Sequence, residues 1–178
     1  MNILEKATAK SNSIVQNIID HEPANYIEAG LQYQIVLMGR FQASVITILY
    51  NHAEDPELRI LLKDARDALV ERTVQMSEDF LQSEDVNLPT IQFPERSLEK
   101  YQDIPDYLHF SDMEIALLLL EMNSTSQMAL LTAINQSYHL EIGNRLRKEL
   151  NMGFDWAYRL EQLMLQRNWL PKIAKIVH

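Results

Sequence analysis

The apolar residues of this chain recur at helical spacing in four long blocks. In the first block they stand three, four or seven positions apart, at Leu31, Ile35, Met38, Val45 and Leu49. This spacing predicts an amphipathic helix, and Asn25 with Glu28 three residues later forms a capping-box pattern at its start. Gly30 and Gly39 lower the helix propensity, so we expect another backbone to approach closely at both.

The second block begins at Asp55-Pro56, an N-cap residue followed by proline at the first helical position. It predicts a helix to about Gln82. The short break before it implies an antiparallel hairpin with the first helix. The apolar stripe of the second helix consists of Leu58, Leu62, Ala65, Leu69, Met76 and Phe80, with Thr73 in its gap.

The third and fourth blocks predict a second hairpin. A capping box at Ser111-Asp112-Met113-Glu114 opens a helix that extends to about Tyr138. The fourth helix begins near His139 and ends at Trp169-Leu170-Pro171.

The two hairpins are joined by residues 83–110, which contain three prolines and no sustained period. Helix connections in bundles need only about 2–8 residues. Each predicted helix has roughly 26–28 residues and therefore spans ~40 Å at 1.5 Å per residue. The linker at 83–110, if extended, reaches about twice that distance. One long crossover between two hairpins is the ferritin-like topology. An irregular flap on an ordinary bundle is the alternative.

We therefore expect an all-α fold. Residues 25–170 form a ferritin-like four-helix bundle with its crossover at 83–110. Residues 1–24 form a short N-terminal helix and linker, and 171–178 form a C-terminal tail.

Composition narrows the range of partners. The net charge of −9 disfavours binding to nucleic acid and to anionic membranes. The chain has no cysteine, which excludes disulfides and thiolate metal sites. Neither a signal-peptide pattern nor an apolar run of the ~20 residues that span a membrane is present. We expect a soluble, cytoplasmic protein.

The histidines do not form a ferritin-like metal motif. Such di-iron sites use a Glu from two helices and Glu-x-x-His from the other two. Only His109 follows an acidic residue, Asp106, at that spacing, and this pair lies in the linker. His52, His109 and His139 stand near helix ends or in the linker, where we expect them to be solvated. The sequence predicts no metal site and no cofactor.

Polar residues near the middles of the helices are the candidate site. Gln42, Thr73, Ser124 and Gln127 stand on or near the inward stripes, where they could form a neutral hydrogen-bonded layer that contacts a ligand or cofactor. Neutral groups suit this position because an unpaired buried charge costs far more. We expect Ser124 and Gln127 to face inward, and Glu121 to face outward or a subunit interface.

The helix boundaries resemble those of a known family. Asp55-Pro56-Glu57-Leu58-Arg59, with Leu61-Leu62 and Ala65 after it, is similar to the start of the second core helix in an uncharacterised ferritin-like family of low-GC Gram-positive bacteria, a domain of unknown function. Leu160-Glu161-Gln162-Leu163-Met164 with Asn168-Trp169-Leu170 resembles its ending. The resemblance spans residues 25–170 and implies the fold but no activity. Histidines are common on the inner helix faces of that family, whereas the corresponding positions here are Thr73 and Glu121.

Three functions follow as hypotheses. The sequence contains no catalytic motif, so we predict no catalytic residues and favour a non-enzymatic helical bundle that acts by self-association, as a homodimer, or by docking another protein. A metal-dependent oxidoreductase or metal-binding protein is an alternative based on topology alone. A third is a binder of small hydrophobic ligands, with a cavity lined by methionine and tyrosine.

Overall fold

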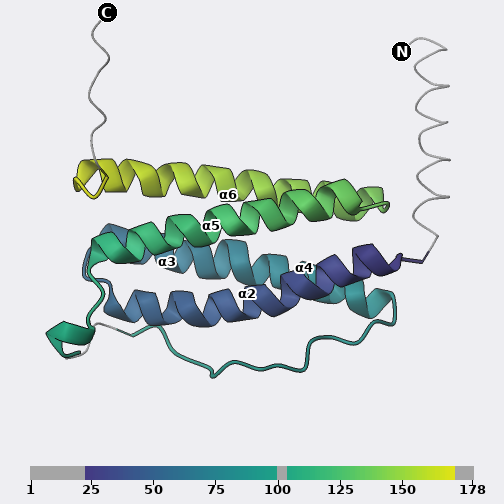
Figure 1. The fold of residues 1–178 in the computed structure, drawn as a ribbon, viewed down its shortest axis with the longest axis horizontal. Helices are drawn as coiled ribbons and strands as arrows, with labels where there is room; N and C mark the ends of the chain where they lie inside the picture. Colours follow the sequence, from purple (N-terminus) through teal and green to yellow (C-terminus); the bar gives the residue numbers. More distant parts are fainter. Residues whose placement is uncertain (1–22, 100–103, 171–178) are drawn as a thin grey trace, which may run out of the picture.

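The computed structural model describes residues 23–99 and 104–170, and these form helices without any strand (Figure 1). The all-α class is confirmed. The helix predicted within residues 1–24 lies outside the described residues, of which this segment contains only 23 and 24, and the tail predicted at 171–178 lies wholly outside them. The long helices are α2 (Tyr26–His52), α3 (Pro56–Asp64), α4 (Glu71–Ser83), α5 (Asp112–Gln136) and α6 (Leu140–Gln166).

The helices begin where local capping groups satisfy their first amides. The Asn25 side chain accepts hydrogen bonds from the amides of Ile27 and Glu28, at 2.9 and 3.0 Å. Asp55 caps α3 in the same way, and Ser111 opens α5 with the complete capping box. These residues satisfy amides that have no partner inside the helix, so the predicted starts are correct.

The linker between α4 and α5 runs along the whole bundle (Figure 1). At one end Glu84, just after α4, accepts a hydrogen bond from the amide of Ala24 at the start of α2. At the other end Asp112, the first residue of α5, accepts from the amides of Glu54 and Asp55 in the α2–α3 turn. The linker therefore crosses from end to end, and α4 and α5 run in the same direction.

Polar contacts hold this linker against α2. The Arg40 guanidinium donates to the carbonyl of Pro89 at 2.6 Å, and the Asn51 amide donates to the carbonyl of Ser97 at 3.1 Å. The linker is thus a strap fixed at several points, and the alternative of a local flap is excluded.

The second predicted helix extends from Pro56 to Ser83, as expected, but it contains a π segment that the sequence did not predict. Between α3 and α4 the chain forms a π-helical segment, η1 (Ala65–Val70), in which the amide of Glu71 donates to the carbonyl of Arg66, five residues back. Beside it the indole of Trp156 donates to the carbonyl of Leu61 at 3.0 Å. A π segment accommodates extra chain within a helix and is frequent at functional sites.

The core consists of two apolar clusters, one toward each end of the bundle. The first packs around Leu58, Leu62, Leu119 and Leu160. The second packs around Phe80, Leu130, Leu146 and Leu150. The stripe predicted on α2 is only partly buried; the face of α2 that is most buried contains Glu28, Gln32, Val36 and Gly39.

The two glycines of α2 have different surroundings. A Cβ at Gly39 would collide with the stiff side chain of Val74, whereas a Cβ at Gly30 would meet nothing within 4 Å. Close approach is confirmed at Gly39, although by a side chain rather than a backbone, and the prediction for Gly30 is wrong. The expectation of close approach at Gly30 was based only on the low helix propensity of glycine, which carries no information about contacts with other helices.

Alanine at these two positions is expected to change stability in opposite directions. Gly30→Ala should raise the free energy of unfolding by up to about 1 kcal/mol, because it improves helix propensity in open space. Gly39→Ala should lower it, because overpacking costs about 1–3 kcal/mol, and Val74→Ala should restore the loss in the double variant. Urea unfolding measures all three. A stabilising Gly39→Ala would contradict the packing described here.

Candidate functional site

A cavity of about 450 Å³ lies at mid-bundle between α2, η1, α4, α5 and α6. Its wall is mostly apolar and includes Leu31, Ile35, Ile46, Leu69, Leu119 and Trp156. Protein interiors normally contain few voids larger than a water molecule. Leu31 and Ile35, which the sequence placed in the core stripe of α2, therefore border this space as well as packing against the cluster around Phe80 and Leu146.

The cavity reaches the surface between α2 and α5. Met38 of α2 and Met128 of α5 both line it and are exposed, Met128 by 63%. Two sets of polar contacts join the same pair of helices, at Gln42–Ser126 and at Glu28–Ser137. Met38 and Met128 stand between these two sets of contacts along their helices, on the exposed part of the cavity wall.

Three of the four predicted site residues line this cavity. Gln42 comes from α2, Thr73 from α4 and Gln127 from α5. The hydroxyl of Thr73 donates to the carbonyl of Leu69 at 2.7 Å, within its own helix. The structure thus brings these three residues together around one space.

The fourth, Ser124, was wrongly predicted to face inward. It is exposed, and its hydroxyl donates to the carbonyl of Leu120 at 2.9 Å. Ser126 takes the inward position and bonds the amide group of Gln42 at 2.9 Å. Side chains two residues apart on an α-helix point in directions that differ by about 200°. A small error in the assumed rotation of α5 about its axis therefore exchanges the inward-facing and outward-facing serine. Glu121 is exposed, as expected.

Glu149 is a cavity residue that the sequence analysis missed. It lines the wall from α6, is 4% exposed, and its Oε1 lies 3.1 Å from Nε of Arg72. Burial raises the pKa of Glu149, while the charges of Arg72 and Lys148 act against that rise. In the sequence Glu149 stands between Leu146 and Leu150, on the apolar stripe of α6. This position alone could have indicated a buried carboxylate.

Gly153 lets α5 and α6 come close at the cavity wall. It is buried, and a Cβ there would lie 3.5 Å from Oδ1 of Asn123 and 3.7 Å from Nε2 of Gln127. Asn123 donates to the carbonyl of Gly153 at 3.4 Å. The polar side chains of α5 thus lie directly over this turn of α6.

Comparison with known proteins adds a structural relative. A protein of Bacillus halodurans, provisionally described as a spore coat protein, has the same fold, with a TM-score of 0.80 and 21% sequence identity over 90% of this chain and 98% of that chain. No family model matches the sequence. No curated protein matches it. The likeness establishes the fold over most of the chain.

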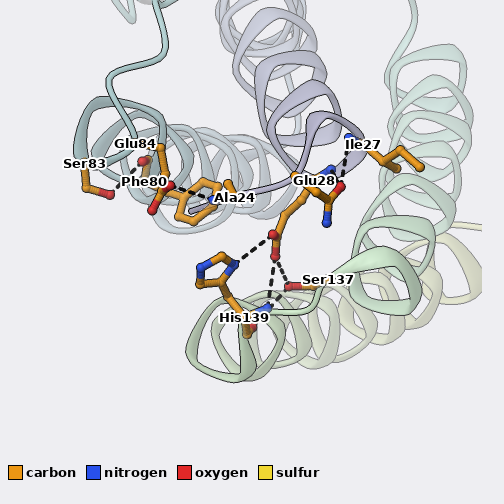
Figure 2. Close-up of polar contacts among 9 residues, drawn as sticks. Ala24, Ile27, Glu28, Phe80, Ser83, Glu84, Ser137 and His139 are labelled. Carbon is orange, nitrogen blue, oxygen red and sulfur yellow. Dashed lines mark hydrogen bonds and ion pairs between the residues drawn. The ribbon is translucent and has the colours of Figure 1, made fainter. Parts of the chain in front are cut away.

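A second polar cluster joins the start of α2 to the turn between α5 and α6 (Figure 2). Glu28, which is 2% exposed, accepts a hydrogen bond from the hydroxyl of Ser137 at 2.7 Å and lies 2.8 Å from Nδ1 of His139. The amide of His139 also donates to Glu28, at 3.2 Å. Contrary to expectation, His139 is buried, with the ring of Phe80 against its edge.

The net effect of this cluster is to lower the pKa of Glu28. Burial alone would raise it, but the hydrogen bonds from Ser137 and His139, together with the charge on His139, outweigh burial. The cluster fixes helix ends in register, and none of Glu28, Ser137 and His139 lines the cavity. Its signal in the sequence was weak because the partners are far apart in the chain.

The histidines of the linker region do not assemble a metal site in the described part of the chain. The rings of His52 and His109 stack at 5.5 Å between centroids. Within residues 23–99 and 104–170, no group of three or more acidic or histidine side chains is placed to hold an ion. No helix in those ranges is both long and apolar enough to cross a lipid bilayer.

Proposed function

We propose that this protein is a non-enzymatic helical bundle that binds a small, largely apolar molecule in the mid-bundle cavity. The cavity itself, about 450 Å³ in volume and open between α2 and α5, supports this proposal. Ligand sites in proteins measure roughly 300–1,000 Å³ and combine apolar walls with a few polar groups. An apolar cavity of about 150 Å³ is already large enough for benzene.

The proposal also explains why the space is not filled. A cavity destabilises a protein in proportion to its volume, because its wall atoms lose packing partners. Here some positions in the cavity wall that larger apolar residues could fill are occupied by small or polar residues, such as Gly153 and Ser126. A bound molecule would supply the missing contacts.

The order of the helices supports the finer proposal that the bundle is ferritin-like. Two hairpins joined by one long crossover define that topology, and the strap from Glu84 to Asp112 has this course. Ferritin-like metalloproteins hold their ions at mid-bundle. In this chain the same level holds Gln42, Thr73, Gln127 and apolar side chains, and its one carboxylate, Glu149, is paired with Arg72. This lining suits an organic molecule better than a cation.

Titration with butylbenzene, monitored by tryptophan fluorescence, tests the proposed function. Trp156 lines the cavity and the second tryptophan, Trp169, does not, so a Trp169→Phe variant reports the cavity alone. We expect a saturable change in emission that corresponds to one site. Emission that stays constant up to the solubility limit of butylbenzene, with calorimetry also showing no heat of binding, would exclude the proposal.

Self-association is a second proposed function, and it is compatible with a ligand site. Phe154, Tyr158 and Leu165 are all exposed along α6, and extended apolar patches on a surface mark interaction sites. The structural relative is provisionally described as a spore coat protein. We therefore propose a homodimer through α6. Light scattering that finds only monomer at high micromolar concentration would exclude it.

A further inference from the structure

The mid-bundle cavity extends along the bundle axis. On α2 its wall runs from Leu31 to Ile46, a rise of about 22 Å at 1.5 Å per residue. On α5 the wall runs from Leu119 to Thr132, a rise of about 20 Å. The two helices are antiparallel, because the start of α2 bonds the end of α5 and the α2–α3 turn bonds the start of α5. Both stretches therefore border the same length of the bundle.

The cavity is narrow for its length. A volume of about 450 Å³ spread over ~20 Å leaves a mean cross-section of roughly 20 Å². Since benzene, with six carbons, occupies a cavity of about 150 Å³, the volume here holds roughly eighteen carbons. An extended hydrocarbon chain with bonds of ~1.52 Å advances about 1.25 Å per carbon, so the length holds about sixteen. Volume and length agree for a single unbranched chain, whereas a compact ring system of equal volume would be shorter and wider.

Several polar side chains of the wall already have partners within the protein. Gln42 bonds Ser126, and Thr73 donates to a carbonyl of its own helix. Asn123 donates to the carbonyl of Gly153. These groups are satisfied without a ligand, so a hydrocarbon chain can pass them without leaving their hydrogen bonds unmade.

The two ends of the cavity differ in their access to water. Ile46, Leu119 and Trp156 belong to one apolar cluster and are each at most 3% exposed, so this end is closed. At the other end Gln34 and Thr132 line the wall and are exposed. Both are polar and uncharged. The closed end therefore suits a methyl group, and the open end suits an uncharged polar group.

We infer that the cavity binds one unbranched hydrocarbon chain of about sixteen carbons that has an uncharged polar head. Its terminal methyl group lies near Trp156, and its head lies at Gln34 and Thr132. This inference rests on the proposed function and adds the chemical class of the ligand, a long-chain lipid such as a fatty alcohol.

Titration of the full-length Trp169→Phe variant with 1-alkanols of six to fourteen carbons, monitored by the fluorescence of Trp156, tests the inference. We expect one saturable site whose affinity rises about fourfold with each added methylene across the whole series, because the cavity buries each one. Affinities that level off within the series would overturn the inference and, if butylbenzene binds, leave the proposed function standing. Failure of every alkanol and of butylbenzene to bind would overturn both.

A pair of variants tests the lengthwise placement of the chain. Ile35 and Ile134 are both partly buried against the cluster around Phe80, but only Ile35 lines the cavity. Ile35→Phe should weaken the binding of 1-tetradecanol at least about tenfold, because it displaces several methylenes. It should leave the affinity for butylbenzene unchanged, since the closed end alone holds that ligand. Ile134→Phe is the matched control and should bind both ligands normally.

Two results would overturn this placement. One is equal binding of 1-tetradecanol by the Ile35→Phe and Ile134→Phe variants, which would mean that the chain does not reach Ile35. The other is an equal loss of affinity for 1-tetradecanol and butylbenzene in Ile35→Phe, with the helical circular dichroism of the original protein retained. That loss would place both ligands in the same part of the cavity.

Discussion

Glu28→Ala is expected to lower the free energy of unfolding by about 3–5 kcal/mol at neutral pH. Removing the Glu28 carboxylate leaves the buried donors of Ser137 and His139 without an acceptor, and each buried donor left without a partner costs about 1–3 kcal/mol. Glu28 holds three groups at once: the Ser137 hydroxyl and both the amide and the ring of His139. Its loss would release the α5–α6 turn from the start of α2. For a domain with a total stability of about 5–15 kcal/mol this is a large share.

The effect should also depend on pH in a defined direction. The pKa of Glu28 in the folded protein lies below its ordinary value of 4.5. Its contribution is therefore complete above that value and is lost as the pH falls through the pKa of the folded state. Urea unfolding at pH 7 and at pH 3 should show the difference between the original protein and Glu28→Ala shrinking on acidification. Glu121→Ala, at an exposed position, is the control, and equal losses in the two variants would contradict the role of the cluster.

Gly153→Leu is expected to weaken the binding of butylbenzene at least about 100-fold. The Cβ at this position meets only ordinary van der Waals contacts, with the side chains of Asn123 and Gln127. We expect the rest of the leucine side chain to extend past them into the cavity that Gly153 lines. It would occupy the space that the ligand needs, and each lost methylene contact costs about 0.8 kcal/mol of apolar burial. Replacing glycine within a helix also adds up to about 1 kcal/mol of stability.

Calorimetry and urea unfolding of the same Gly153→Leu sample separate a filled cavity from a misfolded protein. We expect lost binding together with stability equal to or above that of the original protein. Asn151→Leu changes an exposed residue of α6 outside the cavity wall and should bind butylbenzene normally. Unchanged binding by Gly153→Leu would mean that the ligand site is elsewhere.

The features predictable from the sequence were those fixed by local chemistry or chain length. Asn25, Asp55 and Ser111 mark helix starts because each side chain bonds amides only two or three residues away. The course of the crossover followed from the length of the linker relative to the helices. Gln42, Thr73 and Gln127 were placed near mid-bundle by counting along each helix.

The remaining features depend on contacts between distant residues. The partners Glu28 and His139 are 111 positions apart, and a capping pattern explained Glu28 without them. The π segment at Ala65–Val70 left no mark on the apolar stripe, because Leu62, Ala65 and Leu69 keep helical spacing across it. The choice between Ser124 and Ser126 depended on the rotation of α5, which is set by packing against α2 and α6.

A crystal structure of the protein grown with 4-bromophenol tests the central claim most directly, because bromine can be located by its anomalous scattering. We expect one bromine peak inside the mid-bundle cavity, near Leu119 and Trp156. A cavity filled by protein side chains, with bromine absent or bound only on the outer surface, would contradict the account.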